Sequence, residues 1–238
     1  MKAIVTGHSR GLGEGIARAL LARGAEVMGI ARHGNPGLPG VREVALDLGD
    51  PAALSAWLDG GELAAFLAGA ERAILINNAG VVQPVGPPGG QGAGRLALAV
   101  TVNVTAALVL TDAFVAATAG CAGRRVAHVS SGAGRAPYSG WSLYCATKAA
   151  LDMHARAVAL DGLPNLSIAS VAPGVIDTAM QAEIRATAQT DFPAIERFMA
   201  LKRDGALADP GDAGAALVDY VLDARFGNAP VADLRDLG

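Results

Sequence analysis

The sequence has few of the residues that mark a secreted or metal-binding protein. It contains two cysteines, Cys121 and Cys145, which form neither a C-x-x-C pair nor the dense framework that stabilises small secreted domains. Its four histidines show no metal-ligand spacing, so the sequence predicts no metal site. We expect both thiols to be reduced and buried, and the protein to be cytoplasmic.

Charge of one sign and long apolar runs are also scarce. The net charge of −3 gives no electrostatic reason for a nucleic acid or an anionic membrane to be the partner. The uncharged apolar stretch at residues 96–111 is shorter than the ~20 residues that a membrane-spanning helix needs, and it contains Asn103. The opening residues MKAIVTGHSR have too short an apolar run for a secretory signal. These absences favour a soluble protein that acts on a small molecule.

What the sequence does have is a regular alternation of two kinds of segment. Short apolar runs such as KAIVT, EVMGIA and RAILIN are separated by longer segments rich in alanine and leucine, such as GLGEGIARALLARG. Strands that are apolar on both faces and separated by segments of helix length are typical of a parallel sheet with helices on each side. Because 52% of the residues are hydrophobic and no linker or repeat divides them, we expect one α/β domain over residues 1–238. Its predicted architecture is a doubly wound parallel sheet, a three-layer αβα Rossmann fold.

Two segments are predicted less definitely. Residues 81–94 are too rich in glycine and proline for a regular element, and they predict a loop after the fourth strand. Such loops line the binding crevice of a doubly wound sheet. Residues 225–238 form either a last edge strand or a frayed tail.

A glycine-rich stretch, IVTGHSRGLGEGIARAL, lies near the front of the chain. Thr6, Gly7, Gly11 and Gly13 give the pattern T-G-x-x-x-G-x-G between a predicted strand and a predicted helix. Glycine lets backbone approach a pyrophosphate, and the free N–H groups at a helix N-terminus attract negative charge. The alternative is a tight turn without a ligand. INNAG, which closes the fourth strand at residues 76–80, is likewise either a ligand-facing loop or an ordinary turn.

Tyr144 and Lys148 lie four residues apart in a predicted helix, so their side chains share one face. A tyrosine with a pKa near 10 is a poor base at neutral pH, and a nearby ammonium group stabilises the phenolate and lowers that pKa. Lysine is rare in this chain, which otherwise has only Lys2 and Lys202. The alternative is a surface pair without a chemical role.

The order T-G-x-x-x-G-x-G, N-N-A-G, a helix asparagine, a serine, Y-x-x-x-K and P-G resembles the short-chain dehydrogenase/reductase family across essentially the whole chain. In that family the serine lies thirteen positions before the tyrosine, which selects Ser131 over Ser130. The resemblance implies four catalytic residues: Asn103, Ser131, Tyr144 and Lys148.

The family assigns each of these residues a role. Tyr144 would donate its proton to the developing alkoxide, and Ser131 would hydrogen-bond the carbonyl oxygen. Lys148 would bind the nicotinamide ribose and keep the phenol acidic, while Asn103 would hold a water that connects Lys148 to solvent.

The same resemblance implies a set of cofactor-binding residues from the glycine loop, the ends of the strands and the segment SVAPGVIDT. Asp47 matches the residue that contacts adenine. The set comprises Gly7, Ser9, Arg10, Gly11, Leu12, Gly13, Arg32, Asp47, Leu48, Asn78, Ala79, Gly80, Tyr144, Lys148, Pro173, Gly174, Val175, Ile176 and Thr178.

Charge at the end of the second strand indicates which cofactor is used. Enzymes that choose NAD place a carboxylate there, whereas NADP users place an arginine. Here the position is Ala31 and Arg32 follows, while Glu26 lies at the other end of the strand. Arg10 adds a second guanidinium, and two guanidiniums suit a phosphate monoester. We therefore expect NADPH; the alternative is that both arginines are solvated surface residues.

The C-terminal half more narrowly resembles the benzil reductase and sepiapterin-reductase-like branch, whose members reduce diketones and other activated carbonyls. The segments that carry this resemblance include SSGAGRAPYSGWSLYCATKAALDM and DFPAIERF, and residues 178–208 would form a lid over the substrate. Side chains offering apolar surface to a bulky substrate, or alternatively packing in the core, are Tyr138, Trp141, Met180, Ile184, Phe192, Phe198 and Met199.

Three other functions share parts of this pattern. A non-catalytic NADPH-binding redox sensor commonly lacks the tyrosine or the lysine, whereas a sugar-nucleotide epimerase is longer and has a shorter glycine-loop spacing. An NAD-dependent hydroxysteroid or sugar-alcohol dehydrogenase would have an acid at Ala31. The helices expected at residues 95–118 and 142–160 are apolar over much of their circumference. In the family these helices form an intersubunit bundle, so we expect a homodimer or homotetramer.

Overall fold

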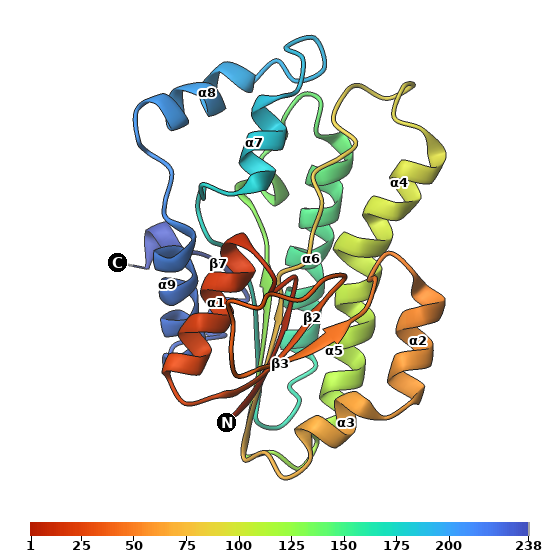
Figure 1. The fold of residues 1–238 in the computed structure, drawn as a ribbon, viewed down its shortest axis with the longest axis vertical. Helices are drawn as coiled ribbons and strands as arrows, with labels where there is room; N and C mark the ends of the chain where they lie inside the picture. The colour runs from red at the N-terminus through yellow and green to blue at the C-terminus, as the bar shows by residue number, and fades with distance from the viewer. Residues whose placement is uncertain (238) are drawn as a thin grey trace.

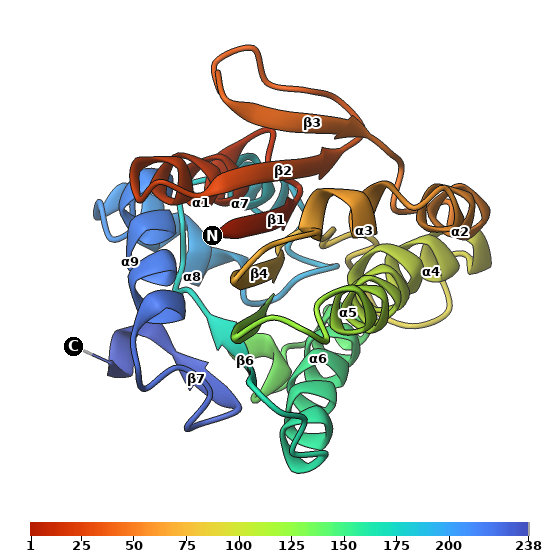
Figure 2. The same ribbon diagram turned by 90° about the horizontal axis from the view of Figure 1, so that it is seen from below.

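The computed structural model describes residues 1–237 and contains one sheet of seven parallel strands (Figures 1 and 2). The strands are β1 (Lys2–Thr6), β2 (Glu26–Ala31), β3 (Val41–Ala45), β4 (Arg72–Asn77), β5 (Gly123–Val129), β6 (Leu166–Ala172) and β7 (Val231–Asp233). Their order across the sheet is β3-β2-β1-β4-β5-β6-β7, and every neighbouring pair is parallel. The predicted doubly wound fold is confirmed.

The α-helices cover both faces of this sheet, as Figure 2 shows. They are α1 (Gly11–Ala22), α2 (Pro51–Asp59), α3 (Glu62–Leu67), α4 (Ala93–Val100), α5 (Ala106–Ala117), α6 (Ser142–Leu160), α7 (Ala179–Arg185), α8 (Ile195–Arg203) and α9 (Pro210–Leu222). Helices α1 and α9 bury their apolar sides in one core cluster, which includes Ile16 and Leu217. Helices α2, α3, α5 and α6 close a second cluster on the other face, around Phe66 and Phe114.

The strand order reverses at one point of the sheet, between β1 and β4. From β1 the chain builds outward through β2 and β3, then returns to pair β4 with the free side of β1. In doubly wound sheets ligands bind at the carboxyl ends of the strands where the order reverses. The loops after β1 and β4 meet at this point, and β5 lies beside them. Helices α7 and α8 lie at the end of the molecule away from the N-terminus (Figure 1).

The C-terminal segment forms a strand. Val231–Asp233 pairs with β6 in parallel, with Val171 opposite Ala232.

Two further local features are not evident from the alternation of segments in the sequence. Residues 51–67 form two helices, because Gly61 takes a φ of +74° between α2 and α3. Both thiols are free, but only Cys121 is buried, and Cys145 is half-buried.

Within residues 1–237 one continuous helix, Ala93–Ala117, is long and apolar enough to cross a membrane by length and composition alone. It joins α4 and α5 through a π-helical turn, η1 (Thr101–Thr105) (Figure 1). Core helices of soluble proteins pass the same test. Leu110 and Phe114 of this helix are fully buried in the core cluster beneath β4 and β5, whereas Leu98 on its outer side is half exposed.

Candidate active site

The glycine loop leaves its backbone open at the carboxyl end of β1. Gly7 and Gly11 have φ angles of +67° and +58°, a region that favours glycine. A Cβ placed on Gly13 would lie 2.1 Å from the Gly7 carbonyl oxygen, so only glycine fits there. Helix α1 begins at Gly11, and its first N–H groups are free of intrahelical partners. Backbone alone thus forms a cradle that fits a pyrophosphate and that side chains would fill.

The end of β4 is tied to this loop by hydrogen bonds. The Thr6 hydroxyl accepts from the backbone N–H groups of Asn78 and Ala79, each at 2.9 Å. The Asn78 side chain donates to the Thr6 carbonyl at 2.8 Å and to the Gly7 carbonyl at 3.3 Å. The sequence-predicted N-N-A-G segment therefore lies directly beside the glycine loop, and its first asparagine, Asn77, faces the core instead.

Asn103 joins the loop after β4 to α6. Its side-chain amide donates to the Val81 carbonyl and accepts from the Val81 N–H, both at 2.8 Å, and it also donates to the Thr147 hydroxyl at 3.2 Å. Asn103 lies in the π-helical turn η1, where the helix geometry departs from its regular repeat. Gly80 is adjacent: a Cβ on it would lie 3.4 Å from Asn103 Oδ1 and 3.7 Å from Lys148 Nζ.

Lys148 and Tyr144 are both buried on the same side of α6. The Lys148 ammonium donates to the Val129 carbonyl at the end of β5, at 2.8 Å, and lies 5.6 Å from the centroid of the Tyr144 ring. Burial lowers the pKa of Lys148 to about 8, and the charge of Asp152 partly offsets this fall. The predicted proximity of the pair is present, and the alternative of a surface pair is wrong.

The expected depression of the Tyr144 pKa is not found. Burial raises the pKa of Tyr144 to about 12, and a hydrogen bond with the Ser131 side chain opposes this rise only in part. Low dielectric surroundings penalise the charged phenolate and so favour the neutral phenol. Tyr144 is therefore a protonated phenol at neutral pH. Ser131, which precedes the short 3₁₀ turn η2 (Gly132–Gly134), also accepts from the Ala133 N–H at 3.1 Å.

The comparisons with known proteins agree with this geometry. A profile of the short chain dehydrogenase family matches residues 1–189. The chain belongs to the short-chain dehydrogenase family. It is 38% identical over 237 residues to a benzil reductase ((S)-benzoin forming) of Bacillus cereus, covering 94% of each chain. It is 32% identical to a sepiapterin reductase of Meriones unguiculatus, covering 98% of this chain and 95% of the relative. The crystal structure of a short-chain dehydrogenase/reductase from Burkholderia vietnamiensis matches with a TM-score of 0.72 and 45% identity, over 100% and 98% of the two chains.

As a member of this family the chain is an oxidoreductase that acts on CH–OH or C=O groups, and its P-G segment lies beside the glycine loop. Gly174, after β6, has a φ of +89°. A Cβ on Gly11 would lie 3.2 Å from the Thr178 side chain, so this segment borders the glycine loop. Ala208 holds this segment in place: its N–H donates to the Val175 carbonyl at 2.9 Å, and it forms a parallel β-bridge with Ile176. Pro173, with the rest of the segment, follows the end of β6 directly.

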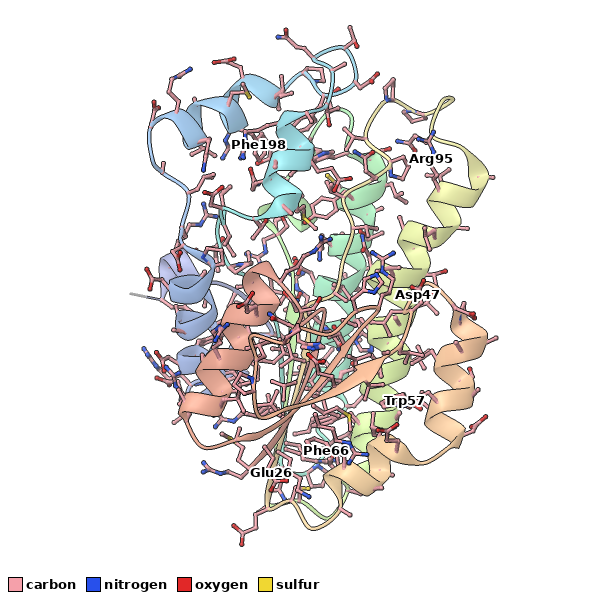
Figure 3. The ribbon with its side chains drawn as sticks, viewed as in Figure 1. Glu26, Asp47, Trp57, Phe66, Arg95 and Phe198 are labelled. Carbon is pink, nitrogen blue, oxygen red and sulfur yellow. The ribbon has the colours of Figure 1, made fainter. Side chains whose placement is uncertain are left out.

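The residues predicted to take the adenosine end lie on exposed loops. Arg10 and Arg32 are exposed, and within residues 1–237 neither guanidinium has an ion pair or a hydrogen bond to protein. Asp47 is exposed and accepts from the Gly49 N–H at 2.8 Å, while Leu48 beside it is buried. Figure 3 shows Glu26 at the end of the molecule away from Asp47. Ser9 and Leu12 line the glycine loop itself, half-buried and buried respectively.

The side chains predicted to form apolar substrate surface mostly pack on one another. Trp141 stacks on Phe192 with ring centroids 4.5 Å apart and meets the Tyr144 ring edge-on at 5.2 Å. Phe198 of α8, labelled in Figure 3, completes this cluster, with its ring centroid 5.3 Å from that of Trp141 and 5.4 Å from that of Phe192. Of the seven side chains, Trp141, Ile184, Phe192 and Phe198 are buried, and Met180, Met199 and Tyr138 remain partly or largely exposed. The alternative of core packing holds for the four buried ones.

Three positions that hold the catalytic side chains are absent from the sequence predictions. Val81 and Val129 act through backbone atoms, which leave no trace in residue identity. Thr147 donates to the Tyr144 carbonyl at 2.9 Å while it accepts from Asn103. Its place three residues after Tyr144, inside the Y-x-x-x-K pattern, is the signal that could have identified it.

Proposed function

We propose that this chain is an NADPH-dependent carbonyl reductase that transfers hydride to an activated ketone or an α-diketone. The observation that carries the proposal is the meeting of the buried Tyr144–Lys148 pair with Gly80 at the carboxyl ends of β4 and β5. Acid–base chemistry and a backbone cradle for a dinucleotide thereby lie together at the carboxyl end of the sheet.

The proposed mechanism assigns each side chain one task. A bound nicotinamide cofactor supplies the hydride. Tyr144 holds a proton on its phenol oxygen at neutral pH, because burial raises its pKa, and donates that proton to the developing alkoxide. Ser131, hydrogen-bonded to Tyr144, orients the carbonyl oxygen. The Lys148 ammonium attracts electron density on the phenol oxygen as the proton leaves, and it would hold the ribose hydroxyls next to Gly80.

The preference for NADPH rests on charge. Arg10 and Arg32 flank the place where the second strand and the glycine loop end, and both guanidiniums are exposed. No carboxylate stands at Ala31, the last residue of β2. Two unpaired guanidiniums favour the additional phosphate of NADPH over the bare ribose of NADH.

The substrate class is supported by two relatives and by the surroundings of Tyr144. The relatives are named benzil reductase and sepiapterin reductase, and both names denote reductases of activated carbonyl compounds. Trp141 packs on the Tyr144 ring and is backed by the buried Phe192 and Phe198, while Tyr138 and Met180 border this cluster and stay partly exposed. Partly exposed apolar side chains on such a rigid backing suit a flat apolar substrate, and α7 and α8 would act as its lid.

The proposed partner, besides the substrate, is a second copy of the chain, and the proposed location is the cytoplasm. Helices α4, α5 and α6 lie side by side on the outside of the molecule (Figures 1 and 2). Their large exposed apolar side chains are Leu98, Val100, Val109, Met153 and Leu160. A homodimer or homotetramer that packs these helices together would remove this surface from water.

The test is the oxidation of NADPH, and separately of NADH, with benzil, 1-phenyl-1,2-propanedione, sepiapterin and a simple aromatic aldehyde. The loss of the reduced-nicotinamide absorbance measures the rate. Turnover that prefers NADPH and a diketone supports both parts of the proposal. Tight NADPH binding without turnover on any of the four compounds would overturn the carbonyl reductase and favour a redox sensor.

A further inference from the structure

A buried carboxylate outside the catalytic set lies one helical turn beyond Lys148. Asp152 of α6 is 5% exposed. Its Oδ1 accepts hydrogen bonds from the hydroxyls of Ser130 and Ser170, each at 2.7 Å, and its Oδ2 accepts from Arg135 Nε at 3.2 Å. Burial of an ionised carboxylate is costly unless its oxygens are hydrogen-bonded or paired. Three donors from three other segments meet this condition here.

These donors connect Asp152 to the segment that presents Ser131. Ser130 directly precedes Ser131 at the end of β5, and its N–H donates to the Val171 carbonyl of β6 at 2.8 Å. Arg135 follows η2 and also donates to the Ala232 carbonyl of β7 at 2.8 Å. Hydrogen bonds therefore hold the turn between Ser130 and Arg135 at both of its ends, and Asp152 accepts one of them at each end.

Between these two hydrogen-bonded ends, η2 packs closely on α6. A Cβ on Gly134 would lie 3.0 Å from the Lys148 carbonyl carbon and 3.1 Å from Asp152 Oδ2. The backbone of the turn thus rests on the part of α6 that carries Lys148. A shift of Asp152 would displace the turn, and with it Ser131, relative to Tyr144 and Lys148.

We propose that Asp152 is a positioning residue for the reaction, which holds the Ser131 turn against α6 and sets a buried negative charge one helical turn from Lys148. This inference rests on the proposed function, in which Ser131 and Lys148 serve Tyr144. It assigns Asp152 no contact with the substrate or the cofactor.

The second half of the proposal follows from the charges that surround Lys148. On α6 these are Tyr144, a protonated phenol, and Asp152, whose negative charge raises the pKa of Lys148 against the effect of burial. From β5, His128 faces it as a neutral imidazole, because burial lowers the pKa of His128 to about 3. The positive charge of Arg135 is paired with Asp152 at 3.2 Å. Asp152 therefore supplies the negative charge that favours the ammonium.

The small number of lysines allows a direct measurement that does not depend on turnover. In protein labelled with ¹³C at lysine Cε, the only lysine signals come from Lys2, Lys148 and Lys202. Replacing Lys2 and Lys202 with arginine assigns the third signal to Lys148. Asp152→Asn preserves the shape of the side chain and removes its charge. We expect the titration midpoint of Lys148 to fall below its value of about 8, and the alkaline limb of kcat/KM to move to lower pH in parallel.

Ser170→Ala is the matched control, because it removes one hydrogen bond to Asp152 and keeps the charge. We expect the Lys148 midpoint to stay where it is, while kcat falls about 10-fold because Ser131 is less firmly placed. A merely structural role for Asp152 would lower thermal stability in both variants and leave the Lys148 midpoint unchanged.

Each outcome has a defined meaning. An unchanged Lys148 midpoint in folded Asp152→Asn overturns the electrostatic half, and wild-type kcat in Ser170→Ala overturns the positioning half. If circular dichroism shows that Asp152→Asn does not fold, Arg135→Gln replaces it: loss of the positive charge beside Asp152 should raise the Lys148 midpoint, and an unchanged midpoint counts against the proposal. Wild-type protein without carbonyl reductase activity would contradict the proposed function, whereas the Lys148 titration would still test the effect of Asp152.

Discussion

Gly214 of α9 lies against Gly15 of α1 so closely that a Cβ on Gly214 would come within 2.4 Å of the Gly15 carbonyl carbon. A Cβ on Gly15 would in turn lie 2.2 Å from the Pro210 carbonyl oxygen. The two helices therefore meet backbone to backbone on one face of the sheet, and this contact fixes the position of α1, whose N-terminus forms the proposed phosphate cradle.

Gly214→Ala should lower the free energy of unfolding by about 3 kcal/mol, the upper end of what overpacking costs, because backbone cannot move aside as a side chain can. Gly94→Ala in α4 is the matched control: a Cβ there has nothing within 4 Å. In a helix it should raise stability by about 0.5–1 kcal/mol. Urea denaturation measures both, and equal effects of the two substitutions would contradict the close helix contact.

The pKa values of Lys148 and Tyr144 predict the pH dependence of the proposed carbonyl reduction. Burial lowers the Lys148 pKa to about 8, so the ammonium is present below that pH and is lost above it. Tyr144 stays protonated throughout this range, because its pKa is raised to about 12. At saturating cofactor, kcat/KM should therefore be level at neutral pH and fall as the pH rises through about 8.

Lys148→Arg separates this assignment from other causes of the fall. Arginine stays charged up to a pH of ~12, so the variant should be slower but should lack the alkaline limb near pH 8. If wild type and variant decline in parallel, the limb belongs to another group. Circular dichroism at each pH checks that both proteins remain folded.

Tyr144→Phe removes the proposed proton donor and leaves the ring that packs edge-on against Trp141. A general acid contributes ~10²–10⁴-fold to the rate, so we expect a loss of kcat in that range with the dissociation constant for NADPH nearly unchanged. Stopped-flow turnover and fluorescence titration measure the two quantities. Full activity in this variant would rule out the mechanism.

The fold could be predicted from the sequence wherever a pattern is local. The apolar runs KAIVT, EVMGIA and RAILIN coincide with β1, β2 and β4, and the helix expected at residues 142–160 coincides with α6. The limit of local patterns also explains why the sequence of residues 225–238 allows either a strand or a frayed tail. Residues 231–233 form a strand of only three residues, whose pairing with β6 depends on the finished sheet.

The features of the candidate site likewise separate into those that a local pattern predicts and those that depend on the tertiary fold. The spacing of Tyr144 and Lys148 predicts their proximity. The direction of the pKa shift of Tyr144, however, depends on its burial in a cluster that includes Phe192 and Phe198 from a distant segment. Asp152 shows the limit most clearly. Its partners lie 17 to 22 residues away on separate elements, so no pattern around Asp152 in the sequence indicates a shared network.

The exposed apolar side chains of α4 and α6 predict self-association. Leu160 is 88% exposed, Met153 61% and Leu98 50%, and apolar side chains so exposed cost free energy in a monomer. Leu98→Arg combined with Met153→Arg should reduce the mass measured by light scattering to that of one chain. Met199→Arg, an equally apolar and 44% exposed position on α8, should leave the mass unchanged. A wild-type protein of monomer mass would contradict the expectation.

Arg10 and Arg32 predict how the cofactor is chosen. A hydrogen bond to a charged group contributes about 1.5–3 kcal/mol, so Arg10→Ala and Arg32→Ala should each raise the KM for NADPH by about 10- to 100-fold. The KM for NADH should change little, because it lacks the phosphate that the guanidiniums would bind. Arg42→Ala is the control: Arg42 is an exposed arginine of β3 that already pairs with Glu62 at 2.9 Å. Equal losses for NADPH and NADH in the two test variants would mean that these arginines do not recognise the phosphate, and the preference would have to arise elsewhere on the loop between β2 and β3.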